Sequence, residues 1–235
     1  MTRDRPGHIE TDRAEHRWPA IGAVLIALVL YGLLPSDFTV WLRLAVVVVC
    51  VAIIVPLVIV NPLRMRRQTT RSRRLSLSLV AVLAIANHVA LGQLIVALLV
   101  ADSDQDGTLL LAATQVWATH VIVYALIYWE LDRGGPVVRA SARRADLPLA
   151  DIRFPQDEDS EAVVEVSGRS SARSDWTANF VDYAYFSLAN TMAFSPPDAV
   201  PLSARAKILV GLQALAGYVV LVLVIARAVS LLGSG

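Results

Sequence analysis

Two histidines and two glutamines are spaced symmetrically about Asp104. His88 and His120 each lie sixteen residues from it, and Gln93 and Gln115 each lie eleven residues from it. Two antiparallel helices joined at this point rise equally, about 1.5 Å per residue, so each pair is expected at matched depth. Paired histidines at such a depth could relay protons or bind haem or a metal ion. The alternative is interhelical hydrogen bonding, which contributes about 0.6 kcal/mol per contact.

Other chemistry is poorly represented in the chain. Two histidines without a cysteine or carboxylate beside them are too few for a metal site, and the single Cys50 lies inside an apolar run. No Gly-rich phosphate loop, Ser-His-Asp set or zinc-helix motif is present, and the net charge is only +1. We therefore expect no enzyme activity, no cofactor, no metal and no nucleic-acid partner.

A second segment of interest runs from Asp182 to Ser203, with the sequence DYAYFSLANTMAFSPPDAVPLS. It joins a half-polar aromatic stretch to a proline-broken loop, and an apolar run follows. A spanning helix over residues 177–194 would bury Asp182 at a cost of about 2.5–3.5 kcal/mol. A re-entrant half-helix avoids most of this cost, because irregular backbone is tolerated where it lines a cavity. We expect the re-entrant form, with a spanning helix and a helix lying in the interface as the alternatives.

The spacing of this segment resembles the pore module of potassium channels, which consists of a pore helix, a filter loop and an inner helix. The resemblance rests on Asp182, Thr191, Asp198 and Pro201, followed by a helix that contains Gly217. It implies a homotetramer with Gly217 as the hinge of the inner helix. The side chains nearest the pore axis would be those of Asn190, Thr191, Ser195 and Asp198.

The filter itself departs from that family. Ser195, Pro196 and Pro197 stand where the family has Gly-Tyr-Gly. A filter aims successive carbonyl groups at the ion, which requires backbone angles that glycine reaches and that proline, fixed near about −65°, does not. Potassium selectivity is therefore not expected.

The whole chain also resembles a group of actinobacterial integral membrane proteins. The segments that carry this resemblance are YWELDRGGP from Tyr128, FPQ from Phe154 and AFSP from Ala193. It implies a membrane location and no particular activity.

The composition predicts the elements that must position these residues. Hydrophobic residues make up 56% of the chain and charged residues 17%, far from the values of a soluble domain. Five apolar runs are long enough to cross a hydrocarbon core of about 30 Å as helices: 18–35, 40–60, 75–101, 108–131 and 208–232. The predicted fold is an all-α, polytopic membrane protein.

Its predicted parts follow in order along the chain. A cytoplasmic tail (1–17) precedes a four-helix transmembrane bundle (18–131) and a polar linker (132–176), in which residues 162–166 could form a short strand. A pore-like half-helix and loop (177–204) and a last transmembrane helix (205–235) complete the chain.

Positive charge predicts the orientation. Six arginines and no acidic residue lie between Arg64 and Arg74, so this loop and the N-terminus are expected in the cytoplasm of a cell with the chain in its plasma membrane. The same arginines are candidates for contact with anionic lipid head groups.

Three functions are compatible with these features. The first is a channel-like membrane protein without potassium selectivity. The second is a non-conducting membrane scaffold or assembly protein that retains a pore-like hairpin. The third is a proton-carrying or haem-binding protein that uses the paired histidines.

Overall fold

The computed structural model describes residues 15–35, 40–60, 69–100, 106–158, 161–192 and 199–233. Regular structure in these ranges is overwhelmingly helical, so the all-α fold class is confirmed. Two predicted pore-lining residues, Ser195 and Asp198, lie outside the described residues. The turn at Asp104 and the arginines at 64, 66 and 67 also lie outside them.

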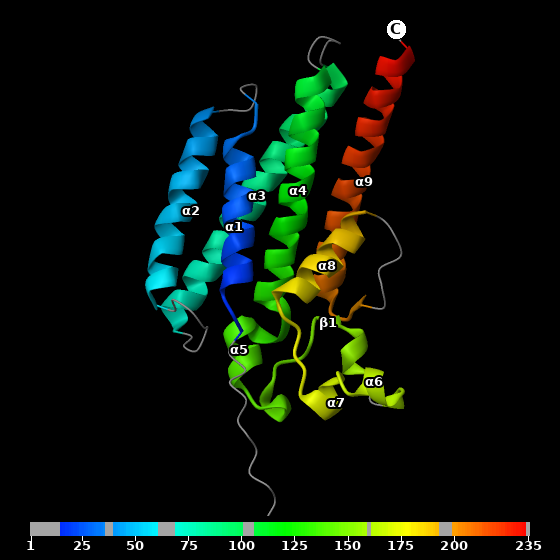
Figure 1. Ribbon diagram of the computed structural model, residues 1–235. Helices are drawn as coiled ribbons and strands as arrows, with labels where there is room; N and C mark the ends of the chain where they lie inside the picture. Colours follow the sequence, from blue (N-terminus) through cyan, green and yellow to red (C-terminus); the bar gives the residue numbers. More distant parts are fainter. Residues whose placement is uncertain are drawn as a thin grey trace, which may run out of the picture.

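Five helices form an up-and-down bundle, with successive helices running in opposite directions (Figure 1). They are α1 (Trp18–Gly32), α2 (Val40–Val60), α3 (Thr70–Val100), α4 (Asp106–Leu131) and α9 (Ala204–Gly233). All but α1 are long and apolar enough to cross a membrane. Helix α1 has 15 residues, or about 22 Å, which is shorter than the predicted run because the helix ends at Gly32.

Helix α4 is the centre of the molecule. It packs against α1, α3, α9 and the short helix α8 (Phe180–Thr191), and 61% of its apolar stretch is buried, compared with 17% for α9. Its buried side chains include the large rings of Tyr124 and Tyr128. The polar network and the histidine pair described below both include side chains of α4.

The linker is a small folded unit at one end of the bundle, which we call the linker end (Figure 1). It contains α5 (Pro136–Ser141), α6 (Val164–Ser167) and α7 (Ser171–Ser174). Residues 164–167 are helical, so the short strand predicted at 162–166 was wrong, since apolar alternation over five residues cannot distinguish a strand from one helical turn. Strand β1 (Ile152–Arg153) instead pairs with β2 (Val200–Pro201) in antiparallel register, with Ile152 opposite Pro201.

This pairing determines the path of the segment between the linker and α9. Helix α8 leaves the linker end and packs between α4 and α9 for 12 residues, or about 18 Å. Residues 200–201 are back beside β1 at the linker end, and α9 starts there. The chain therefore enters the bundle and returns to the end from which it came.

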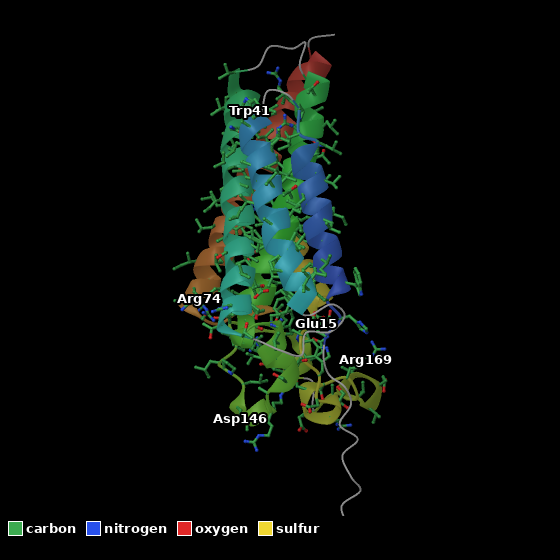
Figure 2. All side chains as sticks on the ribbon, turned by 90° about the vertical axis from the view of Figure 1, so that its left-hand side faces the viewer. Glu15, Trp41, Arg74, Asp146 and Arg169 are labelled. Carbon is green, nitrogen blue, oxygen red and sulfur yellow. The ribbon has the colours of Figure 1, made fainter. Side chains whose placement is uncertain are left out.

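The two ends of the bundle differ in chemistry (Figure 2). Trp41 marks the end away from the linker, whereas Glu15 and Arg74 lie where the helices meet the linker. Asp146 and Arg169 lie in the linker itself. Charged groups thus collect at the linker end, with apolar helix surface above them.

Candidate functional site: a polar seam between α4, α8 and α9

Helix α8 starts where its sequence provides an N-cap. The Asn179 side chain accepts a hydrogen bond from the Val181 N–H (2.8 Å), and the Asp182 carboxylate accepts one from the Asn179 N–H (2.8 Å). This reciprocal arrangement satisfies donors that a helix start leaves unpaired. The polar residues that made a spanning helix costly are thus used to begin a short one.

The polar side chains of α8 recur at helical spacing and face inward. Ser187, Asn190 and Thr191 are buried, and their spacing of three and four residues places them on one side of the helix. The opposite side carries the exposed apolar residues Val181 and Tyr185.

Gln213 of α9 is the hub that receives these groups, and its side chain is completely buried. Its Nε2, which carries two hydrogens, lies within hydrogen-bond distance of three acceptors: Ser187 Oγ (2.7 Å), the Ser187 carbonyl (3.0 Å) and Thr191 Oγ1 (2.7 Å). Its Oε1 accepts from the Tyr128 hydroxyl (2.6 Å) and from Asn190 Nδ2 (2.9 Å). These five residues, which we call the seam, join α4, α8 and α9.

The seam is closed and internally satisfied. The Ser187 hydroxyl donates to the Val121 carbonyl (2.7 Å), and the Thr191 hydroxyl donates to the Ser187 carbonyl (2.9 Å). Within the part of the chain that the structure describes, no seam side chain is among the buried polar groups that lack a partner. A fully satisfied network of this kind rigidifies its surroundings.

Gly217, the predicted hinge, lies one turn beyond Gln213 in the uninterrupted helix α9. A β-carbon at Gly217 would lie 2.9 Å from the Thr191 carbonyl oxygen and 2.9 Å from its Cγ2. The lack of a side chain at this position lets α8 approach the backbone of α9, as small residues do at helix interfaces in membranes.

The predicted histidine pair does come together. The ring centroids of His88 and His120 are 6.0 Å apart. His120 Nδ1 lies 2.8 Å from Asn87 Oδ1, and its Nε2 lies 3.3 Å from the Gln213 carbonyl. His88 Nδ1 faces the Ala84 carbonyl (2.8 Å), so the ring donates there.

Tyr124 links the two rings. Its hydroxyl lies 3.2 Å from His88 Nε2, and its ring centroid lies 4.7 Å from that of His120. With Nδ1 protonated, His88 accepts from this hydroxyl at Nε2. Both ring nitrogens of His120 face oxygen atoms, and a neutral imidazole donates to only one of them, so its other nitrogen keeps a lone pair. The described residues contain no group of three or more His, Cys, Asp or Glu side chains that could hold a metal ion.

Of the predicted glutamine pair, Gln115 forms a hydrogen bond at the end of α1 and not with the seam. Gln115 is buried, and its Nε2 donates weakly to the Leu33 carbonyl (3.4 Å) beyond the end of α1. Gln93 on α3 is half-buried. Gln115 thus connects α4 to α1, on another side of α4 from the seam.

A buried carboxylate fastens the linker to the bundle. Asp132 is fully buried and accepts from the Asp151 N–H (2.7 Å), the Ile152 N–H (3.3 Å) and the Tyr183 hydroxyl (2.6 Å). Arg139 donates to the carbonyls of Trp129 and Asp132 (2.8 and 2.7 Å) and lies over the Tyr183 ring. The linker is therefore held to both α4 and α8.

The backbone beside Asp132 needs glycine. Arg133, Gly134 and Gly135 have φ values of 49°, 78° and 94°, in the left-handed region. A β-carbon at Gly135 would meet the Arg73 guanidinium and, at 3.0 Å, the Glu130 carbonyl. The turn in this part of the chain thus brings α3 close to the end of α4.

Charged side chains gather at the linker end of α1, α3 and α4. Arg73 pairs with Glu130, and Ser76 donates to the same carboxylate. Glu15 accepts from Trp129 Nε1 (3.0 Å) and from the Phe180 N–H (2.7 Å). Burial raises the pKa of Glu15, and the charge of Arg139 opposes that shift.

Sequence reasoning missed Gln213, although a signal was present. It is the one amide side chain in the apolar run 208–232, and a polar residue in a spanning helix marks an interhelical contact. Its partners could not have been identified, because they depend on how α8 rotates against α9.

No family model, curated protein or solved structure matches this chain.

Proposed function

We propose that this protein is a multi-pass plasma-membrane scaffold, with its N-terminus and linker in the cytoplasm and with a pore-like hairpin that conducts no ions. The membrane location is supported by four helices of sufficient length and apolarity. The orientation is supported by the run of arginines in the sequence before and at the start of α3, because Arg74 lies at the linker end.

The observation that carries the non-conducting role is the seam. A permeation path needs polar groups that face water or an ion. Here Asn190 and Thr191, two of the residues expected near a pore axis, are buried and form hydrogen bonds with Gln213 and with backbone carbonyls of the same chain. Gly217 is packed against Thr191, so α8 and α9 form one structural element.

The linker supplies what a scaffold requires, a rigid surface outside the bilayer. Asp132, Arg139 and Tyr183 hold it to the bundle. It also exposes apolar side chains, including the consecutive Val163 (62% exposed) and Val164 (75% exposed). Adjoining apolar groups on an exposed surface are typical of protein interaction sites.

Ion flux from liposomes that contain the purified chain tests the proposal. We expect potassium, sodium and proton leakage equal to that of protein-free liposomes. Flux above this level that is lost in Asn190→Ala would refute the scaffold function and support conduction.

The second candidate remains a channel-like protein without potassium selectivity. The path of the chain favours it, because α8 starts at the linker end and β2 is back at that end, as in a pore module. Conduction of this kind requires a homotetramer with residues 193–198 at its axis. A strictly monomeric particle by light scattering would exclude it.

The orientation has its own test. Helix α9 ends at the opposite end from the linker (Figure 1), so a cytoplasmic linker places the C-terminus outside. A reporter that is active only outside the cytoplasm should therefore be active when it is fused after Gly235.

A further inference from the structure

A small cavity opens at the linker end between α1, α2, α3 and α4. Its volume is about 60 Å³, room for roughly four to six water-sized groups. Most of its wall is apolar and includes Ala20, Val24, Leu57, Leu79 and Leu126.

Polar groups line the cavity at the same level. Arg17, Ser76 and Glu130 belong to its wall. The Arg17 guanidinium donates to the Leu57 carbonyl, and its charge acts on Glu130. The cavity therefore combines an apolar interior with charged groups.

A second, polar recess lies at the start of α3. Its volume is about 350 Å³, and Thr69, Thr70, Arg73 and Arg74 line it. Arg73 connects the two spaces, because its guanidinium also binds the Glu130 carboxylate in the cavity wall. The side chain of Arg74 is exposed.

The charge around these two spaces is positive. Arg17, Arg73 and Arg74 are opposed by the carboxylate of Glu130, and Glu15 is turned toward Trp129, Phe180 and the charge of Arg139. Guanidinium groups fit phosphate oxygens in a two-point geometry. An adjoining apolar cavity adds a place for hydrocarbon.

We propose that these two spaces form a binding site for a phosphate-bearing anionic lipid of the inner leaflet. Its phosphate lies in the recess lined by Arg73 and Arg74, and a segment of one acyl chain enters the cavity beside Arg17. The level of the site, where the bundle meets the linker (Figure 2), is the level of lipid head groups in the proposed orientation. The inference rests on the membrane location proposed above.

Native mass spectrometry of the purified full-length chain tests this site. The probes are phosphatidylglycerol and phosphatidylcholine with the same acyl chains. We expect one phosphatidylglycerol to be retained in preference to phosphatidylcholine. Equal retention of the two lipids would overturn the proposal.

Variants locate the site. Arg74→Gln should weaken phosphatidylglycerol binding about five-fold, the effect expected of one basic residue near the inner leaflet. Arg169→Gln is the matched control, because this arginine is exposed in the linker. An equal loss in Arg169→Gln would show a diffuse charge effect and refute a defined site.

Further experiments distinguish a lipid phosphate from free phosphate, and an error in the lipid site from an error in the membrane location. Inorganic phosphate should not displace phosphatidylglycerol at equal concentration, and effective displacement would overturn the lipid assignment. Ala20→Phe fills the cavity and should therefore weaken the binding of both phosphatidylglycerol and phosphatidylcholine. The binding of inorganic phosphate should change less. Release of the chain from membranes by alkaline carbonate would refute the membrane location itself, whereas membrane retention without lipid selectivity would refute only this inference.

Discussion

Replacing Gln213 with leucine should be among the most destabilising single substitutions in α9. The change keeps the volume and removes an amide that makes five hydrogen-bond contacts with Tyr128, Ser187, Asn190 and Thr191. Interhelical hydrogen bonds in membrane proteins contribute about 0.6 kcal/mol each on average. The amide donates two hydrogen bonds and accepts two at Oε1, so about four such bonds are lost, or about 2.4 kcal/mol in the free energy of unfolding.

The partner groups of Gln213 add to this loss in the free energy of unfolding. Gln213→Leu leaves the Tyr128 hydroxyl and one Asn190 donor without their acceptor in a buried place, and an unsatisfied buried group costs about 1–3 kcal/mol. Adding Tyr128→Phe and Asn190→Leu removes those groups. The triple variant should therefore regain part of the stability that Gln213→Leu loses.

Reversible unfolding of the detergent-solubilised protein in SDS, followed by far-ultraviolet circular dichroism, measures these differences. Tyr218→Phe is the control, because it removes a hydroxyl from an exposed position on the same helix and should change stability by less than about 0.5 kcal/mol. A Gln213→Leu variant as stable as Tyr218→Phe would refute the seam as a stabilising element. So would a triple variant whose losses simply add.

Three further predictions use the same assay. Gly217→Ala should lower the free energy of unfolding by about 1–3 kcal/mol, because its β-carbon would meet the Thr191 backbone. Gly211→Ala is the control, since it has open space around it and should be neutral or slightly stabilising. Equal effects of the two substitutions would contradict the close approach of α8. Gly135→Ala should lose at least about 1–3 kcal/mol, because its φ of 94° strains a residue with a side chain and its β-carbon would meet Arg73, while Gly22→Ala has free space and serves as the comparison. Since burial raises the pKa of Glu15, the native state favours its protonated form. The wild type should therefore lose stability relative to Glu15→Gln as the pH rises from about 4 to about 7. If the stability of the two proteins changed in parallel with pH, Glu15 would not have a raised pKa in the native state.

Parts of the site were predictable because they depend on spacing along one chain. His88 and His120 meet because antiparallel helices of equal rise bring equal offsets together. The N-cap of α8 was also readable in principle, since Asn179 and Asp182 have the spacing of a reciprocal cap. The direction in which Asn190 and Thr191 point was not readable, because a helix of 12 residues can present either face to its neighbour.

The sequence by itself determined the all-α class, four of the long apolar helices and the concentration of arginine before and within the start of α3. These features follow from composition, run length and charge, which act locally along the chain. Only the tertiary structure decided that the pairing of β1 with β2 brings the chain after α8 back to the linker end. It also decided that Gln213 contacts the polar face of α8 and that Asp132 holds the linker to the bundle. Those outcomes depend on packing between segments distant in sequence, where the need to satisfy buried polar groups selects one arrangement.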